Sequence, residues 1–256
     1  MEDFYFVADW GAKHYLKVPN VMISAGSVWQ PKTNKFSLSR THIPDTVEQV
    51  FLDSGGYSFF SYYPDYPFTI EEYINLANII KDQSGITRVV TLDYPCEPDI
   101  NRSRVSTNEE RIQKTVSNAV ECIQYDETIP WLPVIQGYTI DEYLYCVDLY
   151  KDAGITSDYW AIGSICSRKG FPYKIRRIIT TLSEALQSKI HAFGISLKYL
   201  YDPQIFNNIY SSDSAAWVWG ATKMEQKPQM ILDYLEKLDY IFSLHSGQSI
   251  LMEFKE

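Results

Sequence analysis

The feature that most restricts the fold of this sequence is a regular alternation of short apolar runs with helix-sized segments. Apolar runs rich in β-branched and aromatic residues recur along the 256 residues, and most neighbours are separated by enough chain for a helix. Parallel strands need such crossover segments between them. Seven or eight units of this kind predict one α/β domain over residues 1–256, a closed TIM-type (β/α)8 barrel rather than an open sheet.

The expected elements follow from these patterns. Strands are predicted at 4–8, 21–26, 50–52, 88–93, 131–137, 159–163, 190–195 and 205–210, with a further short one at 250–254. Helices are predicted at 70–81, 107–125, 139–150, 173–186 and 228–244, the first three after Thr-x-x-Glu capping signals. The polar segment 29–45 is typical of a loop. Either the run 4–8 is the first barrel strand, or a strand after Asp213 closes the barrel.

Carboxylates and an amide follow several predicted strands. Asp53, Asp93 and Asp213 each come after an apolar run, and Gln136 ends another. In a parallel barrel all these positions meet on one rim, where chemistry is carried out. Clustered carboxylates raise one another's pKa and are costly to assemble, which favours a functional role. Considered singly, each has a structural alternative, as an Asx turn, a helix cap or a buried amide bonded to backbone.

Two of these carboxylates lie in distinctive local sequences. Asp53 opens Asp-Ser-Gly-Gly-Tyr at 53–57, where paired glycines allow positive φ or close approach of a flat ligand. Asp213 lies in Ser-Ser-Asp-Ser-Ala-Ala-Trp at 211–217, between two hydroxyls, Ser212 and Ser214, that we expect to orient it.

The combination resembles the tRNA-guanine transglycosylase superfamily, whose members exchange guanine in nucleic acid for a 7-deazaguanine. Residues 53–57 resemble its Asp-Ser-Gly-Gly-aromatic signature, and 212–216 are similar to Phe-Asp-Ser-Ala-Ala of its archaeal branch. Asp93 before a proline-containing loop, Gln136-Gly137 and Ile162-Gly163 are similar to the family's base-reading positions. The order of these motifs is preserved over most of the chain.

The resemblance implies a role for each position. Asp213 is the expected nucleophile, forming a covalent sugar ester, and Asp53 the expected acid and base. A backbone N–H near Gly163 would meet the base carbonyl, and Tyr57 and Phe193 would sandwich the base. The full set of expected substrate-binding residues is Asp93, Gln136, Gly137, Gly163, Ser54, Gly55, Tyr57 and Phe193.

The sequence also departs from the tRNA-modifying enzymes. Residues 217–256 contain no cysteine and a single histidine, His245, whereas those enzymes carry a C-terminal zinc site of clustered Cys and His. We therefore expect no metal and no cofactor, and we do not expect the dimer that the family builds around its zinc region. The sequence leaves the oligomeric state open, with a monomer as one alternative. The short barrel is most similar to the DNA-modifying branch of phages and bacterial modification clusters. The implied partners are DNA and a 7-deazaguanine such as preQ0 or a derivative, with the target base flipped out or unpaired.

Charge and composition set further bounds. The net charge of −9 argues against a protein coated for nonspecific nucleic-acid binding, although basic clusters at 168–177 and at Arg102 and Arg104 suit a few phosphates. Four scattered cysteines indicate reduced thiols. An acidic amino terminus and the absence of an apolar run of about 18 residues predict a soluble protein of the cytoplasm, or of the host cytoplasm if viral.

Three other functions remain open at this point. The same pentosyltransferase chemistry could act on tRNA. A small-molecule barrel enzyme could use Lys198 as a Schiff-base lysine, although a solvated loop lysine is the simpler interpretation. A noncatalytic nucleic-acid-binding barrel is the third, and the retained Asp53 and Asp213 argue against it. His14, His42 and His191 lack metal-like spacing and are interpreted as surface or core histidines.

Overall fold

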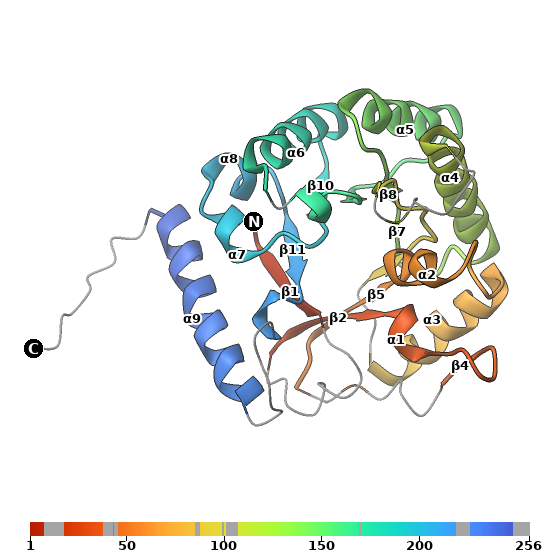
Figure 1. Ribbon diagram of the computed structural model, residues 1–256, viewed down its shortest axis with the longest axis horizontal. Helices are drawn as coiled ribbons and strands as arrows, with labels where there is room; N and C mark the ends of the chain where they lie inside the picture. The colour runs from red at the N-terminus through yellow and green to blue at the C-terminus, as the bar shows by residue number, and fades with distance from the viewer. Residues whose placement is uncertain are drawn as a thin grey trace, which may run out of the picture.

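The structure, a computed structural model, describes residues 1–7, 18–37, 43, 46–84, 88–98, 100, 107–168, 170–218 and 226–247. The predicted strand at 250–254, His14, His42, Arg102 and Arg104 lie outside the described residues. Figure 1 shows a ring of helices around a central parallel sheet, with the last helix, α9 (Lys227–His245), packed on one side.

The central sheet contains nine strands in the described part of the chain, in the order β7-β6-β5-β2-β1-β11-β10-β9-β8. Their pairings are all parallel. The strands are β1 (Asp3–Val7), β2 (Asn20–Ser24), β5 (Gln49–Asp53), β6 (Arg88–Val90), β7 (Trp131–Leu132), β8 (Val134–Ile135), β9 (Tyr159–Ile162), β10 (Lys189–Ala192) and β11 (Ser211–Ser214).

The two edges of this sheet meet at Pro133. β7 and β8 are halves of one extended segment, with β7 paired to β6 and β8 paired to β9. Proline has no N–H to give to a ladder, but its carbonyl still accepts from the Ala161 N–H at 2.9 Å. Counting the two halves as one position gives eight, and the predicted (β/α)8 barrel is confirmed. β1 pairs with β2 and β11, so the run at 4–8 is the first barrel strand.

Alternation along the strands divides the core into two layers. Inward-facing residues fill the barrel, among them Tyr5, whose ring stacks on Phe51 with centroids 4.0 Å apart. Their neighbours Phe4 and Phe6 face outward and pack against Tyr234 of α9. The aromatic filling closes the barrel interior and leaves polar side chains at the carboxyl ends of the strands.

The crossover helices cover the sheet with the expected signals at their starts. They are α3 (Ile70–Ser84), α4 (Asn108–Tyr125), α5 (Ile140–Asp152) and α6 (Pro172–Leu186). α4 and α5 begin with complete capping boxes, in which Thr107 pairs with Glu110 and Thr139 with Glu142. α6 has proline in its first turn and ends at Gln187 in the left-handed conformation.

Several sequence expectations differ from the structure. Segment 29–45 is not all loop, because β3 (Trp29–Gln30) and β4 (Lys35–Phe36) form a small antiparallel pair after the short helix α1 (Ala25–Val28). The strand predicted at 205–210 is wrong, since a short helix α8 (Pro203–Phe206) and a turn occupy this stretch and α7 (Leu197–Leu200) precedes them. The last strand is instead β11, all four residues of which are polar and buried. The strand predicted at 88–93 ends at Val90, and Asp93 follows it.

Candidate active site

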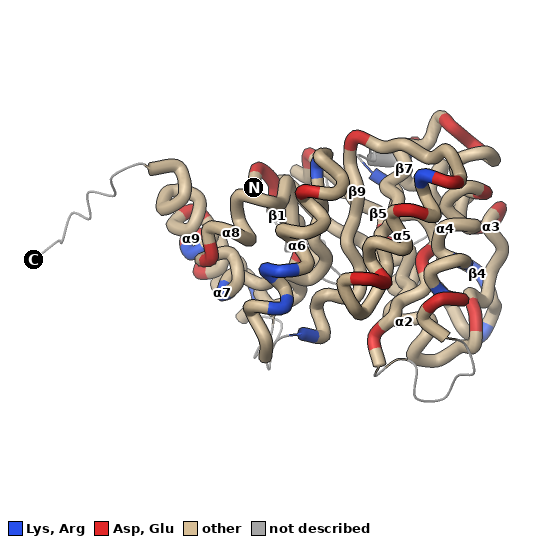
Figure 2. The backbone as a smooth tube through the Cα atoms, turned by 90° about the horizontal axis from the view of Figure 1, so that it is seen from above, with Lys and Arg blue, Asp and Glu red and all other residues tan. Residues whose placement is uncertain are grey.

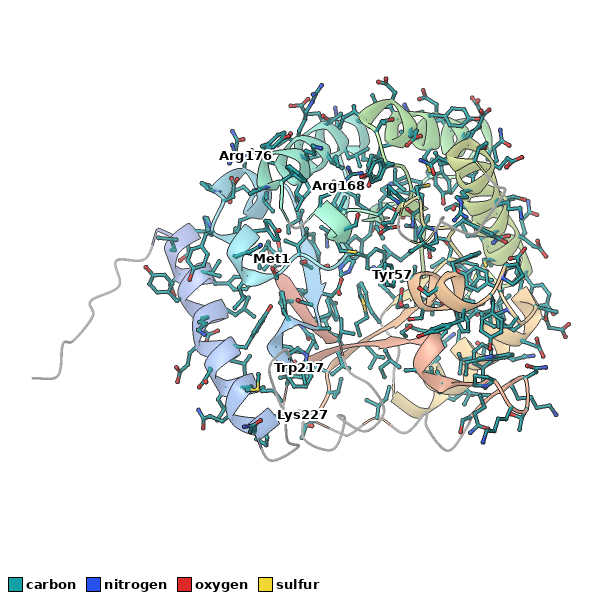
Figure 3. The ribbon with its side chains drawn as sticks, in the orientation of Figure 1. Met1, Tyr57, Arg168, Arg176, Trp217 and Lys227 are labelled. Carbon is teal, nitrogen blue, oxygen red and sulfur yellow. The ribbon has the colours of Figure 1, made fainter. Side chains whose placement is uncertain are left out.

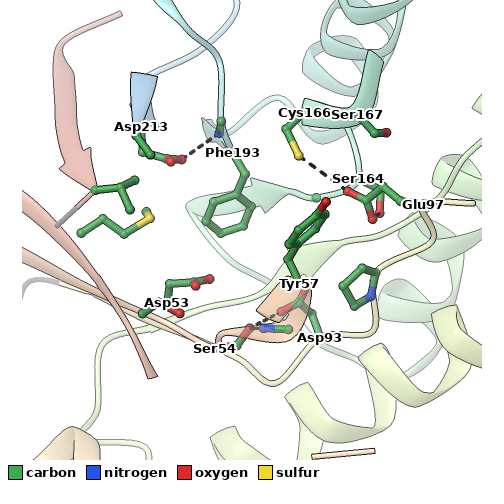
Figure 4. Close-up of a pocket in the computed structure, with 18 of the residues that line it drawn as sticks. Asp53, Ser54, Tyr57, Asp93, Glu97, Ser164, Cys166, Ser167, Phe193 and Asp213 are labelled. Atoms are coloured by element: carbon green, nitrogen blue, oxygen red, sulfur yellow. Dashed lines mark hydrogen bonds between the residues drawn. The ribbon is translucent and has the colours of Figure 1, made fainter. Parts of the chain in front are cut away.

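A cavity of about 460 Å³ opens at the carboxyl ends of the strands. Eight of the ten residues expected at the site line it, namely Asp53, Ser54, Tyr57, Asp93, Gln136, Gly163, Phe193 and Asp213. Gly55 and Gly137 are not among the residues that line the cavity. Figure 4 shows Asp53 and Asp213 directed into the same space from different strands.

Both hydrogen bonds that hold the Asp213 carboxylate go to the same oxygen, Oδ1. The residue is 5% exposed. Oδ1 accepts from the Gly194 N–H at 2.9 Å and lies 3.2 Å from Nε2 of His191. Gly194 has φ +68°, and a Cβ there would come within 2.7 Å of the Cys166 Cβ, so this donor position requires glycine. The carboxylate is thus fixed by two donors on one oxygen.

The hydroxyls expected to orient Asp213 have other partners. Ser212 Oγ donates to the Ala192 carbonyl at 2.8 Å, and Ser214 Oγ accepts from the Ala216 N–H at 3.0 Å. Strand alternation explains the difference, because Ser212 faces away from the barrel interior toward which Asp213 points.

His191 is a residue of the site that sequence reasoning set aside as a core histidine. It is fully buried, with Nδ1 2.5 Å from Ser211 Oγ, and Ser211 in turn contacts the Tyr159 hydroxyl. A hydroxyl donating to Nδ1 leaves Nε2–H to donate to Asp213. A buried polar chain inside the barrel therefore ends on the carboxylate. The sequence does hold one signal for this contact: once the strands are known, strand alternation places the side chains at 191, 211 and 213 on the inner side of the barrel.

Asp53 closes β5 beside two other acids. Its Oδ2 accepts from the Gly55 N–H at 3.1 Å. Removal from water raises the pKa of Asp53 to about 7, with the charges of Asp93 and Asp213 adding to the rise and a hydrogen bond from Ser24 opposing it. The left-handed Gly55 (φ +76°) makes this turn, and a Cβ there would lie 2.7 Å from the Gly26 nitrogen. A carboxyl group with this pKa can give and take a proton near neutrality.

Asp93 and Gln136, which follow β6 and β8, form a hydrogen-bonded pair. Gln136 Nε2 donates to Asp93 Oδ2 at 2.5 Å, and Ser54 Oγ donates to Asp93 Oδ1 at 2.6 Å. The Tyr66 hydroxyl donates to the Asp93 carbonyl at 2.7 Å and so fixes the backbone after β6. Burial raises the pKa of Asp93, although these two side-chain donors counter the rise. The pair presents a carboxyl group and an amide side by side.

Gly163 makes room for that amide. A Cβ at Gly163 would lie 2.2 Å from Gln136 Nε2. Its own N–H donates to the Ile135 carbonyl at 3.0 Å within the sheet, so the backbone donor expected at this corner is not that of Gly163. Gly137 has a similar steric role, because a Cβ there would meet the Tyr143 nitrogen at 2.7 Å and push α5 away.

Two aromatic rings border the cavity from different elements. Tyr57 on α2 (Gly56–Tyr62) is 55% exposed, and Phe193 follows β10. Both rings point into the cavity (Figure 4), and Tyr57 lies over the barrel opening in Figure 3. Exposed aromatic surface at the mouth of a cavity is suited to stacking on a flat ligand.

Glu97 and Ser164 also line the cavity and were missed by sequence reasoning. Glu97 is 2% exposed, and its Oε2 lies 2.6 Å from Ser164 Oγ. Burial raises the pKa of Glu97. Glu97 lies in the loop after β6, with no periodic pattern to mark it as buried.

The basic cluster at 168–177 is partly engaged within the fold. Arg168 donates to the Tyr138 carbonyl at 2.5 Å, and its guanidinium group lies over the Tyr138 ring. Arg176 forms an ion pair with Asp202. Arg176 lies on the outer side of the helix ring (Figure 3). Lysine and arginine segments gather around the start of α6 in Figure 2, while acidic residues are spread over α3, α4 and α5.

Among the described residues, no group of three or more His, Cys, Asp or Glu side chains is placed to hold a metal ion. Cys96, Cys122, Cys146 and Cys166 form no disulfide. Within the same ranges, no helix combines the length and apolar character needed to cross a bilayer.

A parallel barrel with acids and an amide at the carboxyl ends of its strands is the usual arrangement of a barrel enzyme. The family described as "DpdA: DeoxyPurine in DNA protein A" matches residues 14–232, and the chain belongs to this family. The family is tRNA-guanine transglycosylase-like and is involved in 7-deazaguanine modification of DNA. No curated protein matches the sequence.

Proposed function

We propose that the protein is a DNA-guanine transglycosylase that exchanges guanine in DNA for a 7-deazaguanine, such as preQ0 or a derivative, through a covalent aspartyl-sugar intermediate. One observation carries the proposal: Asp53 and Asp213, from β5 and β11, line a single cavity with the Asp93–Gln136 pair. Family membership supports DNA as the polymer and base exchange as the reaction.

Asp213 is the nucleophile of the proposed reaction. Both of its described bonds use Oδ1, so we assign the attack on C1′ of the target nucleotide to Oδ2. The bond from Oδ2 to C1′ forms as the bond from C1′ to N9 breaks, and the electron pair leaves with guanine. N9 of the incoming base then attacks C1′ and displaces the carboxylate. Two inversions retain the configuration of the sugar.

Asp53 handles the proton in both steps. With a pKa of about 7, a substantial fraction is protonated at neutral pH and can protonate the departing guanine. The carboxylate that remains accepts the proton of the incoming base. The burial and the neighbouring charges that raise the pKa of Asp53 therefore suit it to act as acid and base in turn.

Asp93 and Gln136 read the base in this proposal. A carboxylate accepts from N1–H and the 2-amino group of guanine, and the second N–H of the Gln136 amide is directed at O6. Tyr57 and Phe193 would hold the ring between them. Adenine, with a donor where guanine has O6 and no N–H at N1, fails both contacts.

The surface around the mouth supports a nucleic-acid partner. Phe171 and Tyr173, at the start of α6, are 49% and 60% exposed, and Lys174 Nζ lies 4.4 Å from the centroid of the Phe171 ring. Aromatic rings interleaved with cations suit stacked bases and phosphates. Helices of a (β/α)8 barrel begin on the face where the strands end, so these residues lie on the side of the cavity.

The test is incorporation of labelled guanine into polymer. We expect label to enter guanine-containing DNA with wild-type protein, and Asp213→Ala to abolish entry while keeping the fold, measured by circular dichroism. Label entering only tRNA would assign the protein to tRNA instead. A wild-type protein that binds DNA but exchanges no base would indicate a noncatalytic barrel. Denaturing gels of protein with DNA and no acceptor base should show a covalent adduct that Asp213→Asn lacks.

A further inference from the structure

A row of three polar side chains crosses the inside of the barrel next to Asp213. Tyr159 of β9, His191 of β10 and Ser211 of β11 come from strands that are neighbours in the sheet. All three residues are buried, and the His191 ring packs against the Phe51 ring. Polar groups in an apolar interior cost folding free energy unless each is hydrogen-bonded, so this polar row indicates a role beyond filling the barrel.

The direction of each hydrogen bond in the polar row follows from the carboxylate at its end. An ionised carboxylate only accepts, so Nε2 of His191, which lies 3.2 Å from Asp213 Oδ1, carries the proton of a neutral ring. Nδ1 then has a lone pair, and Ser211 Oγ, 2.5 Å away, donates to it. The single Ser211 proton is used in this bond, so Ser211 Oγ accepts from the Tyr159 hydroxyl. Three protons therefore point toward Asp213.

Tyr159 is suited to be the donor at the far end of the polar row. Burial raises the pKa of its phenol group, so this hydroxyl keeps its proton. Hydrogen bonds in a chain polarise one another, so the Tyr159 proton strengthens the bond that Ser211 makes to His191. The reverse order of protons would place the lone pair of Nε2 against the Asp213 carboxylate, and these two acceptors repel each other.

We propose that Ser211 and Tyr159 are positioning residues of the exchange reaction. Their hydroxyls hold the His191 ring with its proton on Nε2, so that Asp213 Oδ1 stays bonded and Oδ2 is left to attack the sugar. The inference rests on the proposed function and adds two residues that do not line the cavity. The Gly194 N–H bonds the same Oδ1 at 2.9 Å, so loss of the His191 donor leaves Asp213 with one of its two described bonds.

Nitrogen NMR of the full chain, isotope-labelled at its histidine nitrogens, tests the order of protons directly. A ring nitrogen that carries a proton, one that accepts a hydrogen bond and one that does neither differ in chemical shift. The His191 signals are identified by their absence from His191→Phe. We expect a neutral ring with a protonated Nε2 and a hydrogen-bonded Nδ1, and in Ser211→Ala an Nδ1 shift that moves toward that of an unbonded nitrogen. A wild-type ring protonated on Nδ1, or on both nitrogens, overturns the inference.

Single-turnover release of guanine measures what the polar row contributes to the reaction. We expect Ser211→Ala to slow release by ~10-fold and Tyr159→Phe by ~3-fold, with little change in affinity for the free base, because each variant loosens the nucleophile and leaves the base-reading pair intact. Ser211→Cys, whose thiol is a weaker donor, should recover part of the rate. Tyr150→Phe is the matched control, since the Tyr150 hydroxyl donates to the Val134 carbonyl at 3.0 Å, outside the polar row, and its rate should equal that of the wild type.

The two measurements separate the inference from the proposed function. Wild-type rates in both Ser211→Ala and Tyr159→Phe contradict the positioning role. A wild-type protein that releases no guanine overturns the proposed function, while the His191 signals, which need no turnover, still decide the order of the protons. If Ser211→Ala does not fold, the wild-type His191 signals and the rate of Tyr159→Phe decide.

Discussion

At the scale of single residues, the raised pKa of Asp53 lowers the stability of the folded protein and suits this side chain to the proposed proton transfer. Its pKa is raised from 3.8 to about 7, so the folded state binds this proton more tightly than the unfolded state does. Ionisation of Asp53 therefore disfavours folding. The penalty is absent below pH ~3.8, grows as the pH rises toward 7, and is complete above it.

Asp53→Asn should accordingly stabilise the protein and inactivate it. We expect the free energy of unfolding at pH 8 to rise by roughly 1–2 kcal/mol, and guanine exchange to fall by about 10²–10⁴-fold. Urea unfolding from pH 5 to 8 should show the gain increasing with pH. Asp152→Asn, a change at an exposed position of α5, is the control and should give no such trend. A stability gain independent of pH contradicts the assigned pKa.

We expect His191 to act on the proposed reaction by positioning Asp213. Replacing it by phenylalanine fills the space but removes the Nε2 donor at Asp213 Oδ1, whereas glutamine can keep an N–H near that position. We expect His191→Phe to slow single-turnover guanine release by about 10–100-fold, with little change in affinity for the free base, and His191→Gln to recover part of the rate. Equal single-turnover rates for wild type and His191→Phe would exclude a positioning role.

At the scale of elements, the start of α5 is tied to the site more closely than the start of α4. Both helices begin with a capping box, but Glu142 accepts from the N–H groups of Tyr138 and Thr139 and from Asn108 Nδ2. Glu110 accepts from the Thr107 N–H. The segment before α5 also carries Gln136, so the cap of α5 holds one wall of the cavity.

The matched pair Glu142→Ala and Glu110→Ala measures this difference. We expect Glu110→Ala to lower the free energy of unfolding by about 1 kcal/mol and Glu142→Ala by about 2 kcal/mol, because more donors lose their acceptor. Only the Glu142 variant should also weaken binding of the free base. Urea unfolding with unchanged m values gives the free energy of unfolding, and calorimetry gives the affinity for the free base. Equal losses of stability and of affinity in the two variants would contradict the proposed link between the cap of α5 and the cavity.

The sequence predicts elements well where the local pattern and the tertiary fold agree. The capped helices α4 and α5 and the apolar strand β5 are confirmed because hydrophobic period and capping signals coincide there. β11 was placed six residues too early, since its serines are buried by hydrogen bonds to residues distant in sequence rather than by apolar character.

The sequence indicates which residues line the cavity where those residues end strands, and it gives no indication where only three-dimensional neighbours bring a side chain there. Asp53 and Gln136 could be named because they follow apolar runs. Gly163 was assigned a backbone contact, whereas its missing side chain is what admits the Gln136 amide. Glu97 and His191 carry no local signal, and only closure of the barrel brings them to the cavity wall.

At the scale of the whole molecule, the barrel determines how a polymer can reach the site. Asp213 is almost fully buried, and the reactive groups stand inside the ring of strand ends rather than on an outer surface. The net charge of −9 offers little general attraction for DNA, so we expect contact to depend on local groups such as the exposed Phe171 and Tyr173 and the neighbouring Lys174 at the start of α6.

A stacked and paired guanine cannot reach Asp213 under these conditions. The target must leave the helix, which costs a few kcal/mol in a paired duplex and less at a mismatch or in a single strand. We therefore expect kcat/KM for guanine exchange to be about 10–100-fold higher for a guanine in single-stranded DNA, or opposite thymine, than for the same guanine paired with cytosine. The comparison uses initial rates of labelled-guanine incorporation, with the same sequence context and the same ionic strength for every DNA substrate. The ionic strength is held constant because salt alone alters the affinity of a protein for DNA. Equal rates on paired and unpaired targets would mean that opening the helix does not limit the rate of exchange. That result would contradict base flipping as the rate-limiting step.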